Sequence, residues 1–172
     1  MATWRDFHTF TRDPSYQVHV DFRFLESTLD NYVKMSNCDL DPPFQRAHVW
    51  SRGQQIAFVE HIVRGGGRGS NIIRFNNFDG DWSRMVLVDG KQRLEAVRSF
   101  MRNEFPIFGE LYFKDFEGPQ PLHLCLVFMV NTLTSDKDVL KWYLEINEGG
   151  TPHTQEELDK VRRTLEDREN AE

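Results

Sequence analysis

Polar side chains follow an apolar run in the segment "MVLVDGKQRLEAVRSF", residues 85–100. Asp89, Lys91 and Arg93 place an acid and two bases where the pattern predicts that a strand turns into a helix. The first N–H groups of a helix lack backbone partners, and with the helix dipole they attract anions. Gly90 would let the backbone approach a ligand closely. This corner is therefore an anion-site candidate, and a solvated Asp-Gly turn with a basic first helical turn is the equally open alternative.

Two other segments carry candidate binding residues. In "DPPFQRAHVW", Gln45 and Arg46 follow two prolines that fix the backbone, so an arginine there can hold an anion at little ordering cost. Trp50 is interpreted as a buried structural residue, with stacking on a base as the alternative. In "LEINEGGTPHTQEEL", Asn147 precedes a glycine-rich break. A flap over a ligand and an ordinary loop between helices fit that break equally well.

Strand and helix patterns are mixed along the chain without regular βαβ alternation. Ser51 with Gln54, and Thr154 with Glu157, form capping boxes that predict helix starts. Strands are expected at 16–20, 71–75, 85–88 and 122–131, the last of them in the centre of the sheet, and a hairpin is expected at 106–118. Helices are expected at 24–35, 51–63 and 91–103, and two more are expected to start at residues 135 and 154. The predicted class is α+β: one domain with a small mixed sheet and surrounding helices.

Length and composition bound the class of protein. The chain has 172 residues, 39% hydrophobic and 28% charged, which is typical of a soluble globular domain. No apolar stretch approaches the roughly 20 residues of a membrane helix, and the N-terminus lacks a signal-peptide pattern, so we expect a cytoplasmic protein without a membrane partner. Cys38 and Cys125 lie far apart in the sequence and are expected to be reduced thiols in the core.

Charge is distributed unevenly. The formal net charge of −6 argues against a protein that coats duplex DNA, yet ten bases stand against five acids between residues 46 and 102. An anion site in the middle of an acidic protein is compatible with this distribution. The sequence has no GxxxxGK[ST], HExxH or GxSxG motif and no metal-ligand spacing of histidines and cysteines. The absence of the GxxxxGK[ST] loop excludes a Walker-type NTPase.

The order of three motifs resembles a known family. "PPFQR", then "VDGKQRLEAVRSF", then "EINEGGTPHTQEEL" is similar to the ParB/sulfiredoxin-like domain with the DGQQR motif, the N-terminal domain type of GmrSD-like modification-dependent restriction enzymes. The similarity runs from about Asp39 to Leu158. It implies a ParB/sulfiredoxin-like fold, with residues 1–38 as an N-terminal segment of the same domain, 39–150 as its core and 151–172 as a C-terminal charged helix.

The resemblance also assigns roles to residues. It implies a pocket whose catalytic residues are Asp89, Gln92 and Arg93, and whose nucleotide-binding residues are Gln45, Arg46, Gly90, Lys91 and Asn147, with Glu157 as the acid after the third motif. Asp89 would coordinate Mg²⁺ or position the attacking water. Lys91 stands where the family usually has glutamine; its charge suits phosphate binding, but any reaction that needs that amide is in doubt.

The function implied is binding and hydrolysis of an NTP with Mg²⁺ in phage or anti-phage DNA metabolism, in a bacterial or phage-infected cell. We expect a stand-alone domain without the HNH-like nuclease domain, with a separate nuclease or host protein as its partner. Two alternatives stay open. One is a non-catalytic DNA- or protein-binding module with the same fold, and the other is a ParB-like nuclease that nicks DNA.

Overall fold

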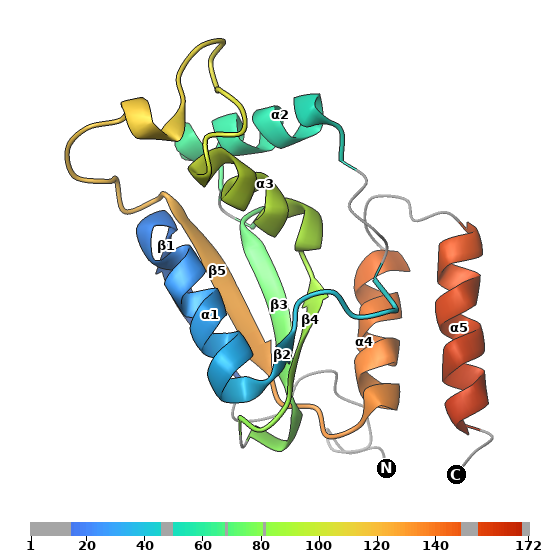
Figure 1. The fold of residues 1–172 in the computed structure, drawn as a ribbon. Helices are drawn as coiled ribbons and strands as arrows, with labels where there is room; N and C mark the ends of the chain where they lie inside the picture. The colour runs from blue at the N-terminus through green and yellow to red at the C-terminus, as the bar shows by residue number, and fades with distance from the viewer. Residues whose placement is uncertain (1–14, 46–49, 68, 81, 149–154, 170–172) are drawn as a thin grey trace, which may run out of the picture.

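The computed structural model describes residues 15–45, 50–67, 69–80, 82–148 and 155–169. Within these residues, five strands form one mixed sheet in the order β1-β5-β3-β4-β2 (Figure 1). β1 pairs antiparallel with β5, β5 parallel with β3, β3 antiparallel with β4, and β4 parallel with β2. The strands are β1 Tyr16–Asp21, β2 Cys38–Asp39, β3 Ile72–Asn77, β4 Met85–Asp89 and β5 Cys125–Asn131.

Helices cover both faces of this sheet. The α-helices are α1 Leu25–Ser36, α2 Arg52–Val63, α3 Lys91–Met101, α4 Asp136–Glu148 and α5 Gln155–Glu169, and the short 3₁₀ helices are η1 Phe22–Phe24, η2 Phe78–Gly80 and η3 Phe113–Asp115. Side chains of α1, α2 and α3 pack on one face, whereas α4 and α5 lie together beside β4 on the other (Figure 1). The α+β class with a mixed sheet, expected from the sequence, is confirmed.

β4 is buried on both faces. Met85 and Leu87 join the core under α1 and α3, while Val86 and Val88 join the core under α4. A strand in this position needs apolar residues throughout rather than alternation, which accounts for the run "MVLV". Asp89 therefore lies at the end of a strand that is packed against helices on both faces.

Most of the elements expected from the sequence are present within one to three residues of their predicted ends. The capping box of α2 forms: Ser51 Oγ accepts a hydrogen bond from Gln54 N at 3.3 Å, and Gln54 Oε1 accepts one from Ser51 N at 2.8 Å. The capping box expected at Thr154 lies outside the described residues. Ser135 Oγ accepts a hydrogen bond from Asp138 N at 3.0 Å at the start of α4.

Two expectations were wrong in detail. The segment 106–118 is not a hairpin: Ile107 and Leu111 form a single bridge, and the chain then enters η3. The apolar residues here pack on a helix instead of pairing, since the rings of Phe113 and Phe116 lie 5.6 and 6.3 Å from that of Phe100. The strand expected at 122–131 starts at Cys125. It is the second strand of the sheet, and the central strand is β3.

The two ends of the described chain contribute to the same structure. β1 adds Val20 to the core beneath α1, and α5 packs on α4 through the buried Val161. Cys38 and Cys125 are both buried free thiols, as expected. None of the helices among the described residues is long and apolar enough to cross a membrane.

Candidate functional site

One carboxylate holds two arginines at the corner between β4 and α3. The antiparallel register of β3 and β4 sets Arg74 opposite Asp89. Asp89 Oδ2 accepts hydrogen bonds from Arg74 Nη1 at 2.7 Å and from Arg93 Nη2 at 2.6 Å. All three side chains are between 18% and 24% exposed, so this cluster is partly shielded and yet reachable from solvent. Each guanidinium has five N–H groups, which leaves donors for a further anion.

Gly90 makes the turn between strand and helix. Its φ is +100°, and a Cβ there would lie 2.8 Å from Ile73 Cδ1 and 3.2 Å from the backbone oxygen of Ile72. Glycine is therefore required by backbone conformation and by the closeness of β3. As N-cap of α3 it offers no side-chain acceptor to the first turn, which also carries no acidic residue. The electrostatics of this helix end thus favour an external anion.

The segment before α2 docks onto this corner through two glutamines. Gln45 Nε2 donates to the carbonyl of Leu87 in β4 at 2.6 Å. Gln92 Oε1, in the first turn of α3, accepts from the backbone N–H of Trp50 at 3.0 Å. The structure therefore brings the "PPFQ" and "DGKQR" motifs together and uses both amides to join them. Arg46 lies outside the described residues.

Lys91 has a carboxylate partner that sequence reasoning did not assign. Its ammonium pairs with Oδ1 of Asp41, which lies two residues after the end of β2. The lysine side chain is only 14% exposed, whereas that of Asp41 is 78% exposed. Three cations and two carboxylates therefore meet at the corner, a net charge of +1. The extra charge that Lys91 adds is compensated by Asp41 in this state.

Asn147 lies in the last turns of α4. Its Nδ2 donates to the carbonyl of Tyr143 at 2.6 Å, one helical turn earlier. The ring of Tyr143 packs against that of Phe44, with centroids 5.2 Å apart, so α4 contacts the residue next to Gln45. α4, which carries Asn147, thus contacts the segment that docks on β4 through Tyr143, a residue that precedes the third motif. Nothing is described for the side chain of Glu157.

The surroundings of Asp89 differ from those of a typical metal ligand. The described residues contain no group of three or more His, Cys, Asp or Glu side chains that could hold a metal ion. A carboxylate oxygen that binds two guanidiniums within 2.7 Å would have to release them to coordinate a hard cation. Metal coordination by Asp89 stays a prediction, and the contacts seen favour a role in orienting Arg74 and Arg93.

Most of the described bases in the middle of the sequence pair with carboxylates. Of its ten bases, Arg46 and Arg68 lie outside the described residues, and the guanidinium of Arg64 lies 4.9 Å from the ring centroid of Phe108. The other seven pair with carboxylates: Arg52 and Arg102 with Glu104, Arg74 and Arg93 with Asp89, Arg84 with Asp136, Lys91 with Asp41, and Arg98 with Glu26 and Glu95. Most of the described bases in this stretch are therefore paired with a carboxylate, and Asp89 and Glu104 each serve two arginines.

Sequence reasoning missed Arg74 and Asp41. Arg74 stood inside "NIIRF", a segment interpreted only as a strand, and the signal that could have found it is the antiparallel pairing of β3 with β4. Trp50 is half-buried with its ring 5.3 Å from that of Phe58, which favours its structural interpretation over base stacking. Comparison with family models, curated proteins and solved structures finds no match to this chain. The family resemblance therefore stays a prediction.

Proposed function

We propose that the β4–α3 corner binds the phosphates of a nucleotide, and that the protein is a nucleotide-binding, NTP-hydrolysing domain of the ParB/sulfiredoxin-like type acting in phage or anti-phage DNA metabolism. The observation that carries the proposal is the placement of Arg74 and Arg93 on one oxygen of Asp89 at the N-terminus of α3. Guanidiniums and helix N-termini are the groups that proteins use most often for phosphate.

Binding is the part of this proposal that the geometry supports most directly. Two guanidiniums from different elements, fixed by a shared carboxylate, lose little conformational freedom when a phosphate arrives. The side chains of Gln45 and Gln92 support the corner by holding the preceding loop. Mg²⁺, where it takes part, would arrive with the phosphate oxygens, because Mg²⁺ sites on nucleotides typically use substrate phosphates and few protein ligands.

The binding test is calorimetric titration of the protein with ATP, GTP, CTP and UTP, each with and without Mg²⁺. Arg74→Gln and Arg93→Gln should each weaken the best nucleotide by about tenfold or more, since each removes charge-assisted bonds to phosphate. Arg84→Gln is the matched control: it also removes an arginine from an Arg–Asp pair, immediately before the other end of β4. Absence of binding to all four nucleotides would end the proposal.

Hydrolysis is tested separately by release of inorganic phosphate. Turnover in the wild type that Arg93→Gln abolishes would support an NTPase. Binding without turnover would support the non-catalytic module. Contact with DNA is the weaker alternative here because seven of the eight described bases between residues 46 and 102 pair with carboxylates. A mobility shift with DNA that weakens steeply with salt would favour it over nucleotide binding.

A further inference from the structure

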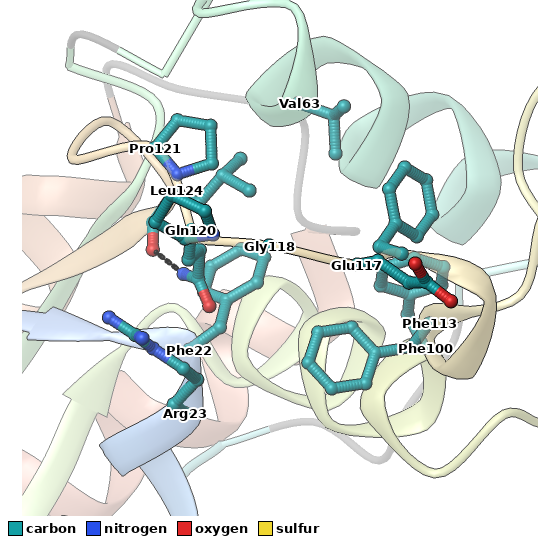
Figure 2. Close-up of a pocket in the computed structure, with 12 residues that line it drawn as sticks. Phe22, Arg23, Val63, Phe100, Phe113, Glu117, Gly118, Gln120, Pro121 and Leu124 are labelled. Carbon is teal, nitrogen blue, oxygen red and sulfur yellow. Dashed lines mark hydrogen bonds between the residues drawn. The ribbon is translucent and has the colours of Figure 1, made fainter.

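A cavity lies at the opposite end of α3 from the anion-site candidate. It has a volume of about 300 Å³ and opens between the end of α3, η1 and the loop that precedes β5. In Figure 2, Pro121 and Leu124 lie on one side of it, Phe113 and Glu117 on the other, Val63 above, and Phe22 and Phe100 below. Phe100 is ten residues after Gly90, which at 1.5 Å per helical residue places the cavity about 15 Å from the corner.

Aromatic rings dominate the lining. Phe22 and Phe100 are almost fully buried and form a floor, Phe113 is partly buried against Phe100, and Phe116 is 48% exposed. Pockets for small molecules are mostly apolar, with a few polar groups that fix orientation, and 300 Å³ is the lower end of their usual size range. The cavity therefore suits a compact ligand with a ring.

Hydrogen bonds hold the walls of the cavity in place. Leu124 O accepts from Gln120 Nε2 at 2.7 Å (Figure 2). It also accepts from Phe22 N at 3.3 Å, and Leu124 N donates to Pro121 O at 3.0 Å. On the side of α2, His123 Nε2 lies 3.0 Å from the carbonyl of Val63. The loop before β5 is thus tied both to η1 and to α2, so that the cavity is formed before any ligand enters.

The charges at the opening favour a cation. Arg23 is matched by Asp21, which accepts from its Nε at 3.1 Å and from its Nη2 at 3.0 Å. Glu117 is exposed, and no cation among the described residues pairs with its carboxylate. The faces of aromatic rings also attract positive charge. The carboxylate and the rings therefore act in the same direction.

We propose that this cavity binds a small organic cation whose ring enters between Phe22, Phe100 and Phe116 and whose ammonium group lies beside Glu117. The apolar walls take the ring and exclude water from it. Glu117 supplies the charge that distinguishes an amine from an acid of the same shape. The proposal is independent of nucleotide binding at the β4–α3 corner.

The probes are tryptamine and indole-3-propionate, which share a ring and a two-carbon chain and differ in charge. Titrations followed by two-dimensional ¹H–¹⁵N NMR should give a dissociation constant of order millimolar for tryptamine, as expected for a ligand of this size. The shifts should centre on Gly118, Phe100 and Leu124, and the acid should bind at least about threefold more weakly.

Two variants with a matched control locate the effect. Glu117→Gln should weaken tryptamine about threefold without changing indole-3-propionate, and Phe116→Ala should weaken both probes several-fold. Glu110→Gln removes the same charge from an exposed glutamate outside the cavity and should change neither. The proposal is overturned by a lack of tryptamine binding up to about 10 mM, by equal binding of both probes, or by shifts that map away from the cavity.

Discussion

Arg74 and Arg93 come from β3 and α3 and donate to the same oxygen, Oδ2 of Asp89. One carboxylate therefore sets the distance and direction of two guanidiniums that the sequence separates by 19 positions. The arrangement depends on the β3–β4 register, which pairs Arg74 with Asp89, and on the helical spacing, which brings Arg93 back over Asp89 one turn into α3.

The first prediction is energetic coupling within this cluster. Double-mutant cycles with Asp89→Asn, Arg74→Gln and Arg93→Gln should give coupling free energies of about 1–2 kcal/mol for each arginine with Asp89, above those of exposed pairs because these side chains are about one-fifth exposed. Urea denaturation of single and double variants measures it. Coupling of about 0.3 kcal/mol or less would mean that Asp89 does not organise the arginines.

The second prediction concerns Lys91 and rests on the proposed phosphate site. Asp41→Asn should release the ammonium of Lys91 from its carboxylate and so raise the affinity for inorganic phosphate or the preferred nucleotide by about two- to fivefold. Asp30→Asn breaks an exposed pair with Lys34 on α1 and serves as the control, with no change expected. An unchanged affinity in Asp41→Asn, measured by calorimetry, would show that Lys91 does not face the anion.

The sequence predicted local features well where neighbouring residues determine them. The start of α2 follows from Ser51 and Gln54 alone, and the strand at 85–88 and the helix after it follow from the apolar run and the Asp-Gly turn. The hairpin at 106–118 failed because its apolar residues pack on Phe100, a contact that no local pattern encodes. The position of β5 beside β3 is likewise set by pairing between distant segments.

The candidate site was predicted in part for the same reason. Asp89, Gly90 and Arg93 lie in one short motif, so spacing alone places them at one corner. Arg74 reaches them through strand register, and Asp41 through a loop that returns to α3. An amide such as Gln45 can face a ligand or a carbonyl of its own chain, and only the tertiary structure shows that it binds Leu87 O.

The third prediction separates backbone conformation from steric contact at Gly90. Gly90→Ala places a Cβ at φ +100° and within 3.2 Å of β3, and it should lower the free energy of unfolding by about 2–4 kcal/mol. Gly65→Ala has a similar φ of +82° with nothing within 4 Å of its Cβ, and it should cost only about 1 kcal/mol. Equal losses in thermal or urea unfolding would show that β3 yields to the added methyl group.

The fourth prediction is a pH dependence from Cys38. Burial raises the pKa of this thiol to about 12, with a smaller contribution from Asp39, against an ordinary value of 9.0. Below pH 9 the thiol is neutral in both states. Between about pH 9 and 12 the unfolded chain loses this proton while the folded protein keeps it, so the free energy of unfolding should fall as pH rises, by up to about 1.4 kcal/mol per pH unit from this group.

Cys38→Ala removes that contribution, together with the smaller effect by which the Cys38 charge raises the pKa of Tyr32, while all other tyrosines and lysines that titrate in the same range are kept. Urea unfolding at several pH values from about 8 to 11, under reducing conditions, should show a smaller loss of stability in Cys38→Ala than in the wild type. Parallel curves for the two proteins would mean that the Cys38 thiol ionises as readily in the folded state as in the unfolded chain. In that case the thiolate of Cys38 would be solvated in the folded protein although the residue is only 7% exposed.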